Sequence, residues 1–327
     1  MTGIMRGRML FHVSLLLLGV AGQAWSQTYP AKPVRVLVGY SPGGSVDTVG
    51  RIFAQKLSAD LGQQFVVENR PGAASNIAAD LVAKSAPDGY TLFMSSGTGL
   101  GTNMAIYTKM PYNPLKDFAP IAMLVYQGNA LVVNPTVPAK TVKELIALAK
   151  ARPGQLNYGS GGNGSSQHMT AELFSKRTGV RMVHVPYKGG APALVDLIAG
   201  QIDLVFSPLP EAIPYIQGGR VRALGVTGAK RSANLPDLPT IAESGVPSFE
   251  FEGFLGIAGP ADMPQNVVAR LNSALNKALT ADDVKKRMYD LGLRLAGGTP
   301  ERLATHMREQ AALMIQIAKD AGVKPVD

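Results

Sequence analysis

The chain has 327 residues, a formal net charge of +9, 46% hydrophobic and 17% charged residues, and no cysteine. This composition excludes an intrinsically disordered chain, and the lack of cysteine excludes disulfides, thiolate metal sites and a cysteine nucleophile. Lysine and arginine are scattered without a run of five, which favours a general attraction for anions over a nucleic-acid site, so we expect no nucleic-acid partner.

The first 26 residues have the layout of a secretory signal peptide. Arg6 and Arg8 give a positive start, an apolar run follows, and small residues stand at the −3 and −1 positions of a cleavage site that ends at Ser26. The apolar run is shorter than the roughly 20 residues of a spanning helix, and no cysteine follows it to carry a lipid. We expect export to the periplasm and a mature chain that begins at Gln27; an uncleaved anchor is the alternative.

Beyond this leader, short β-rich runs alternate with amphipathic helices, which is typical of parallel α/β layers, and the length suits two domains. We expect strands over 34–38, 65–67, 91–95, 130–133, 182–185, 203–206 and 221–226, and one that ends at Tyr158. We expect helices over 49–61, 76–84, 141–151, 166–178, 191–199 and 211–217, with two more around 268–279 and 300–317. Proline and glycine punctuate 235–247, which predicts a long surface loop.

Four glycine- and serine-rich loops follow predicted strands and open predicted helices. They cover 39–45, 95–99, 158–166 and 187–192. In open α/β sheets, ligands bind beyond the carboxyl ends of the strands, and a helix N-terminus there offers unpaired N–H groups with a partial positive charge. Glycine also lets a ligand come close to the backbone. These loops predict a site for a carboxylate or phosphate; the alternative is a set of tight turns that bind nothing.

The loop 158–166 contains Gly159, Gly161 and Gly164 in the spacing G-x-G-x-x-G, but the other features of a cofactor site are missing. A dinucleotide site needs an acidic residue about 20 residues later, and 179–190 contains none. No lysine follows the glycines, as a P-loop requires. We therefore expect no cofactor.

Catalytic arrangements are equally weak. The chain has no H-E-x-x-H metal motif, and His168, His184 and His306 lie far apart in the sequence. We interpret His168 as a helix-packing residue. We interpret Asp47 as a residue that serves the helix dipole and orients the glycine loop, because a bare carboxylate would repel an anionic ligand; contact with a ligand amine is the alternative. We expect no enzymatic activity.

Seven short stretches, taken in order, resemble the Bug-type periplasmic receptors of tripartite tricarboxylate transporters and together span nearly all of the chain after the leader. They are YSPGGSVD at 40–47, VENRPGA at 67–73, PDGYT at 87–91, NYGS at 157–160, VPYKG at 185–189, GQID at 200–203 and LPTI at 238–241. The resemblance implies an α/β, type II periplasmic binding-protein fold, with two doubly wound lobes joined by a two-crossover hinge. It implies that 27–128 and 249–327 form the first lobe and that 129–248 form the second.

The same resemblance implies a receptor that captures a small organic carboxylate in the cleft between its lobes, partly through ordered water. Its partners would be the two membrane subunits of a tripartite transporter, and we expect a monomer. The ligand-binding residues expected on this basis are Tyr40, Pro42, Gly43, Gly44, Ser45, Asp47, Ser96, Thr98, Gly161, Asn163, Gly164, Ser165, Gly189, Gly190, Ala191 and Ser207.

Two positions depart from the family pattern. The family often has aspartate where this chain has Ser207, and often tryptophan where it has Phe254. Familiar ligands such as aspartate, glutamate or citrate are therefore not carried over to this chain. Two other functions stay open: a signalling receptor whose closed form docks on a sensor protein, and a secreted hydrolase or lyase.

Overall fold

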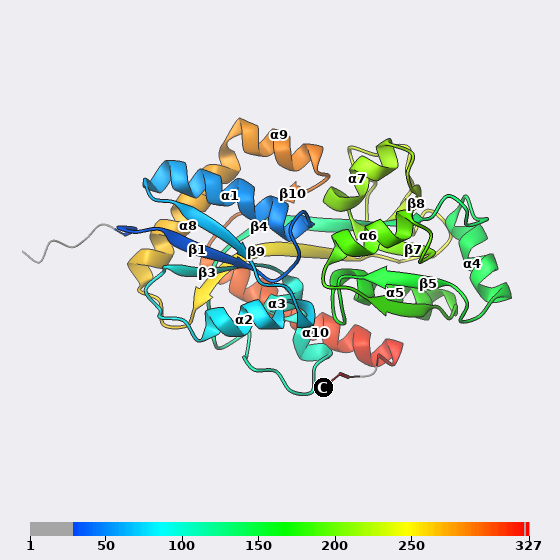
Figure 1. Cartoon of the computed structure of the whole chain (residues 1–327), viewed down its shortest axis with the longest axis horizontal. Coiled ribbons are helices and arrows are strands. Elements are labelled where there is room, and N and C mark those ends of the chain that lie inside the picture. The colour runs from blue at the N-terminus through cyan, green and yellow to red at the C-terminus, as the bar shows by residue number, and fades with distance from the viewer. Residues whose placement is uncertain (1–28, 324, 327) are drawn as a thin grey trace, which may run out of the picture.

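One twisted sheet runs through two lobes that lie side by side along the long axis of the molecule (Figure 1). The computed structural model describes residues 29–323, 325 and 326, so the predicted signal peptide and its cleavage site lie outside the described residues. The strands are β1 (Val34–Val38), β2 (Phe65–Asn69), β3 (Thr91–Ser96), β4 (Phe118–Val133), β5 (Asn157–Ser160), β6 (Val183–Pro186), β7 (Leu204–Pro208), β8 (Arg222–Val226), β9 (Glu252–Pro260) and β10 (Arg294–Leu295). Their spatial order is β2-β1-β3-β9-β4-β7-β5-β6, and β8 and β10 also pair with β4.

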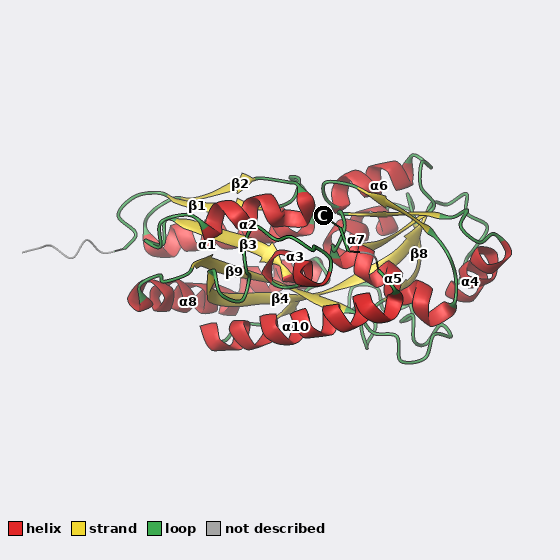
Figure 2. Ribbon diagram, turned by 90° about the horizontal axis from the view of Figure 1, so that it is seen from below, coloured by secondary structure: helices red, strands yellow, loops and turns green. Residues whose placement is uncertain are grey.

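Helices cover the sheet in both lobes (Figure 2). They are α1 (Ser45–Leu61), α2 (Asn76–Ala83), α3 (Gly97–Leu100), α4 (Val142–Ala151), α5 (Ser166–Thr178), α6 (Gly190–Ile198), α7 (Leu209–Gln217), α8 (Gln265–Thr280), α9 (Asp282–Asp290) and α10 (Pro300–Ala321), with short 3₁₀ turns η1 (Ala73–Ser75) and η2 (Thr102–Ala105).

The first lobe has a core on each face of its sheet. β1 lies between β2 and β3 in parallel, and β3 pairs antiparallel with β9. On one face α1 and α8 bury Phe53 and Leu271 against the strands. On the other face α2, α3 and α10 bury residues that include Leu100 and Met307 against Phe93 of β3. Removal of this apolar surface from water is the main force that holds the lobe together.

The second lobe repeats the plan with its own strands and helices. β5 lies between β6 and β7, and both pairings are parallel. Helices α4 and α5 pack on one face around Phe174 and Phe206. Helices α6 and α7 pack on the other face, where Leu194 and Ile213 are buried. Parallel strands with helices on both faces are the doubly wound arrangement that the alternating sequence pattern predicts.

Strand β4 belongs to both lobes. Its residues 118–128 pair with β9 in the first lobe, and 129–133 pair with β7 and β8 in the second. The chain returns to the first lobe through 227–251, and this return path is hydrogen-bonded to β4. Asn129 and Thr227 exchange hydrogen bonds, and Phe251 N–H donates to Thr227 O at 2.9 Å. Two crossing segments joined at one point are the two-crossover hinge expected from the resemblance.

The last helix returns to the first lobe and also reaches the second. Figure 2 shows α10 passing along one side of both lobes. Its far half meets α5, and a small apolar cluster there contains Ile106, Met169, Phe251 and Met314. Within the described residues, no helix has the length and apolar character that crossing a membrane requires.

The structure confirms the predicted α/β layers and adds elements that the sequence pattern conceals. Only 130–133 of β4 are predicted, because Pro120 and Gly128 interrupt the strand pattern. In the structure, irregularities in the pairing with β9 near Pro120 and between Met123 and Val125 accommodate the earlier part of the strand. Strand β9 escapes prediction because glycine recurs along it, at 253, 256 and 259, and glycine is a poor strand former.

Candidate functional site

A cavity of about 30 Å³ lies where the two lobes meet. It is lined by Tyr40, Gly44, Ser45, Val46, Ser96, Gln127, Ser165, Ser166, Gln167, Gly190, Pro208 and Glu211. A neighbouring cavity of about 20 Å³ shares Ser96, Gln127 and Ser166 with it and also contacts Thr98. The smaller cavity lies at the N-termini of α3 and α5, and the larger one lies at the N-termini of α1, α5, α6 and α7, beyond the carboxyl ends of parallel strands. This is where ligands bind in open α/β sheets.

The N-terminus of α1 holds a carboxylate that comes from the opposite lobe. Ser45 N–H donates to Glu211 Oε1 at 2.8 Å, and Glu211 lies in the first turn of α7 in the second lobe. Gly44 is the N-cap residue and has no side chain to cover this helix end. The Ser45 hydroxyl donates to Gln127 Oε1 on β4. The partial positive charge of the helix N-terminus favours the ionised form of Glu211, while burial acts against it.

The glycine loop before α1 is held from behind by Asp47. The Asp47 carboxylate accepts from Gly43 N–H at 3.0 Å, from Arg51 Nε at 3.0 Å and from Asn69 Nδ2 at 2.9 Å. Burial acts to raise the pKa of Asp47, but these hydrogen bonds outweigh it and the pKa is lowered. Asp47 therefore stays ionised and turned away from the cavity, and it orients the loop that carries Pro42.

A hydroxyl chain follows β3. Tyr40 Oη lies 3.3 Å from Ser96 Oγ, and Thr98 N–H donates to Ser96 Oγ at 3.4 Å. All three residues are buried, and burial raises the pKa of Tyr40. Tyr40 therefore stays protonated and its hydroxyl can act as a donor at the edge of the cavity.

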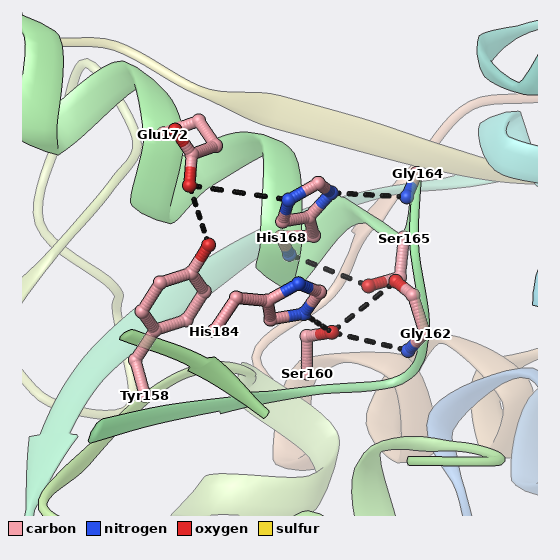
Figure 3. Close-up of polar contacts among 8 residues, drawn as sticks. All are labelled: Tyr158, Ser160, Gly162, Gly164, Ser165, His168, Glu172 and His184. Carbon is pink, nitrogen blue, oxygen red and sulfur yellow. Dashed lines mark hydrogen bonds and ion pairs between the residues drawn. The ribbon is translucent and has the colours of Figure 1, made fainter. Parts of the chain in front are cut away.

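The glycine loop after β5 is fixed by side chains behind it (Figure 3). Gly164 N–H donates to His168 Nδ1 at 3.0 Å, and Gly162 N–H donates to Ser160 Oγ at 3.1 Å. Ser165 is the N-cap of α5, and its hydroxyl accepts from His168 N–H at 3.3 Å. The loop therefore has a defined shape, with Ser165 turned toward the cavity.

Two histidines that are distant in the sequence stack on each other behind this loop. The rings of His168 on α5 and His184 on β6 have centroids 4.1 Å apart, and Tyr158 stacks on His184 at 4.9 Å (Figure 3). Burial lowers the pKa of His168 to about 3, and His184 adds to this; burial lowers the pKa of His184 to about 4. Both rings are neutral near pH 7, so His168 Nδ1 is free to accept the hydrogen bond from Gly164.

The loop before α6 contacts the first lobe directly. The Ser41 hydroxyl donates to Lys188 O at 2.8 Å. A side chain at Gly189 would lie 3.3 Å from Ser41 N, and the φ of Gly189 is +144°, which only glycine adopts readily. A Cβ at Gly190 would lie 2.0 Å from Glu211 Oε2, so glycine is required there for the carboxylate to reach the helix end.

The structure brings together some of the predicted ligand-binding residues and leaves others outside the cavities. Tyr40, Gly44, Ser45, Ser96, Ser165 and Gly190 line the larger cavity, and Thr98 lines the smaller one. Pro42, Gly43, Asp47, Gly161, Asn163, Gly164, Gly189, Ala191 and Ser207 line neither. Ser207 is fully buried on β7, and its hydroxyl donates to Pro208 O at 3.5 Å. Asn163 faces a separate hollow of about 250 Å³ beside His168 and His184.

Sequence reasoning misses six of the cavity residues. They are Val46, Gln127, Ser166, Gln167, Pro208 and Glu211. Most lie at or just before the start of a helix that follows a strand, so the rule that found the glycine loops could have found them too. Burial raises the pKa of Glu211 to about 7, although the hydrogen bond from Ser45 N–H acts in the opposite direction. Among the described residues that line this cavity, Glu211 is therefore the one acidic side chain, and its pKa lies well above the usual value for glutamate.

Two further observations limit what the site does. In the part of the chain that the structure describes, no three His, Asp or Glu side chains are placed to hold a metal ion.

A larger hollow of about 660 Å³ lies near the hinge, between β10 and residues 228–234. None of the glycine loops reaches it. Its lining carries both signs of charge (Lys230, Arg231, Glu250, Glu252 and Arg294), and both arginines are paired, Arg294 with Glu252 at 2.6 Å and Arg231 with Glu243 at 2.9 Å. The helix N-termini make the small interlobe cavity the better candidate for an anion site.

Comparison with known proteins bears on the family and the fold. The family described as "Tripartite tricarboxylate transporter family receptor" matches residues 49–323. Protein BugT from Bordetella pertussis is 34% identical over 307 residues, which cover 94% of each chain. The solved structure of Rpa4515 from R. palustris with adipate has a TM-score of 0.89 at 37% identity, covering 91% of this chain and all of that one. MatC from Rhodopseudomonas palustris with bound malate has a TM-score of 0.85 at 32% identity, covering 88% of this chain and 99% of that one.

Proposed function

Because this chain belongs to the tripartite tricarboxylate transporter receptor family, whose members are periplasmic solute receptors and not enzymes, we propose that it captures a small carboxylate between its lobes. It delivers this ligand to the two membrane subunits of a tripartite tricarboxylate-type transporter. The mature receptor is a periplasmic monomer that begins at Gln27.

The observation that carries this proposal is the convergence of four helix N-termini on one interlobe cavity. Ser45 of α1, Ser166 of α5, Gly190 of α6 and Pro208, the N-cap of α7, all line it. The first N–H groups of a helix have no partner within the helix, and each N-terminus carries roughly half a positive charge. Glu211 already places a carboxylate against one of them, which supports the site's fit for this chemical group. Rpa4515 and MatC, with adipate and malate, carry carboxylate ligands on the same fold.

Ligand entry requires the lobes to part. The cavity of about 30 Å³ has room for roughly two water molecules, so it is too small for an organic acid. The hinge where β4 meets Thr227 and Phe251 is the place where such a motion costs least, since only two segments cross there. The lobes on either side are residues 27–128 with 249–327, and residues 129–248. Closure around the ligand is then a hinge motion of two preformed lobes.

A thermal-shift screen of the mature protein with small organic acids, followed by titration calorimetry, tests this function. We expect at least one carboxylate to raise the melting temperature and bind with one-to-one stoichiometry. The matched amide of the same acid, which has no negative charge, should bind much more weakly. Absence of binding by every carboxylate, or equal binding of acid and amide, would contradict the proposal.

A sensing receptor uses the same fold and the same cleft, so binding data alone do not separate it from a transport receptor. Uptake of the identified acid by cells with and without this chain separates them. Loss of uptake on deletion supports delivery to a transporter. Uptake that persists in the deletion strain while gene expression stops responding to the acid supports the sensing role.

A further inference from the structure

Glu211 is an acidic residue inside a site that is otherwise arranged for anions. Its Oε1 atom takes the N–H of Ser45 at the start of α1. Its Oε2 atom is shielded from water and has no hydrogen-bond partner among the described residues. A buried carboxylate oxygen without a partner is costly, so its presence calls for a ligand group that pairs with it.

Gln167 offers the complementary atom beside it. This residue is 3% exposed and lines the cavity, and its Oε1 accepts from Gly161 N–H, which fixes the amide. Nε2 also has no hydrogen-bond partner in the part of the chain described. Both free atoms surround Gly190: a Cβ there would lie 2.0 Å from Glu211 Oε2 and 2.4 Å from Gln167 Nε2. An unpaired acceptor and an unpaired donor thus lie together on the cavity wall.

We infer that Glu211 is a built-in carboxylate which occupies one anion position of the cleft and makes this receptor select monocarboxylates that carry a hydroxyl group over dicarboxylates. This inference rests on the proposed carboxylate-receptor function. The ligand carboxylate binds at the N-termini of α5 and α6. The ligand hydroxyl donates to Glu211 Oε2 and accepts from Gln167 Nε2, so one oxygen atom satisfies both unpaired groups.

Charge balance favours one ligand carboxylate over two. The four helix N-termini of α1, α5, α6 and α7 supply roughly two positive charges, and the carboxylate of Glu211, when ionised, cancels about one of these charges. The remainder suits a single carboxylate, whereas a second would meet Glu211 in a site shielded from water, where repulsion is strong. An ammonium group would satisfy Glu211 but would bring its own donors against the Gln167 amide. A hydroxyl is the group that fits both atoms.

Four acids of the same chain length separate these effects in titration calorimetry: butyrate, 3-hydroxybutyrate, succinate and malate. Malate differs from 3-hydroxybutyrate only by a carboxylate in place of a methyl group, and succinate differs from butyrate in the same way. Pairs of longer mono- and dicarboxylates that differ in the same way, and the pair benzoate and phthalate, cover the case in which the open cleft accepts larger ligands. The variant is Glu211→Gln, which keeps the size and an oxygen for Ser45 N–H but removes the charge; its melting temperature shows that it folds.

We expect the wild-type protein to bind each monocarboxylate at least tenfold more tightly than its dicarboxylate partner, and each hydroxy acid more tightly than its parent acid. In Glu211→Gln the penalty for the second carboxylate should shrink at least tenfold. Dicarboxylates that bind wild type as well as their partners do, or a preference that survives Glu211→Gln, would overturn the inference while leaving the receptor function intact. Failure of every acid in the series to bind either protein would contradict the proposed function and the inference with it.

Discussion

Substitution of Gly44 by aspartate should weaken carboxylate binding strongly without unfolding the first lobe. Gly44 has φ −74° and ψ 169°, a conformation open to any residue, and a Cβ there would make only ordinary contacts, at 3.4 Å from Glu211 Oε1 and 3.5 Å from Ser41 O. Aspartate and asparagine are both good N-cap residues, so neither should weaken α1. The substitution therefore acts mainly through charge.

The size of the effect follows from the geometry. Ser45 N–H, which follows Gly44 directly, holds a carboxylate oxygen at 2.8 Å in the structure. That oxygen belongs to Glu211, whereas the ligand carboxylate is expected at the starts of α5 and α6, across the cavity that Gly44 also lines. The carboxylate introduced by Gly44→Asp would stand about 8 Å from it, and two unit charges at that distance repel by about 2 kcal/mol at an effective dielectric constant near 20. Since about 1.4 kcal/mol corresponds to a tenfold change in affinity, the expected loss is roughly thirtyfold.

Titration calorimetry with the tightest-binding acid of the screen measures this loss. Gly44→Asn is the matched control, because it fills the same space and caps the helix but carries no charge. We expect Gly44→Asn to lose at most about threefold and Gly44→Asp to lose roughly thirtyfold, with similar melting temperatures for both. Equal affinities for the two variants would refute the reasoning, since charge at the α1 N-terminus would then be irrelevant to binding.

The pKa shifts and the leader give three other predictions. Affinity for a simple carboxylate should fall as the pH rises through about 7, where Glu211 loses its proton, and Glu211→Gln should remove this dependence in calorimetry. The free energy of unfolding should fall as the pH drops below about 6.5, because the unfolded chain then binds protons that His168 and His184, with pKa values of about 3 and about 4, do not. Denaturant titrations at several pH values should show this dependence of the free energy of unfolding on pH. A dependence of the same size in His168→Gln would contradict the contribution of the His168 ring to it. Intact-mass measurement of periplasmic protein should give Gln27 as the first residue; a retained leader would contradict the export prediction.

The sequence predicts the fold well because the signals for it are local. Alternating strand and helix patterns identify most elements of both lobes, and Gly62 marks the end of α1 where the structure has it. Glycine loops at carboxyl ends of strands give the location of the cavity. The crossing strand β4 is harder, because its proline and glycine resemble loop residues until β9 lies beside it.

The details of the site depend on contacts between distant segments, which a single sequence does not reveal. His168 and His184 look unrelated in the sequence, yet the pairing of β5 with β6 brings their rings together. Glu211 looks like an ordinary acidic residue in the first turn of a helix. Only the approach of the two lobes places its carboxylate against Ser45 and removes it from water.

A crystal structure of the mature protein with the tightest-binding acid tests the central claim most directly. The account predicts one ligand between the lobes, with a carboxylate oxygen within about 3 Å of backbone N–H groups at the starts of α5 and α6. The lobes should lie farther apart near Gly190 than in the present structure, to make room for it. A ligand bound in the larger hollow beside β10, or anywhere outside the interlobe cavity, would contradict the account.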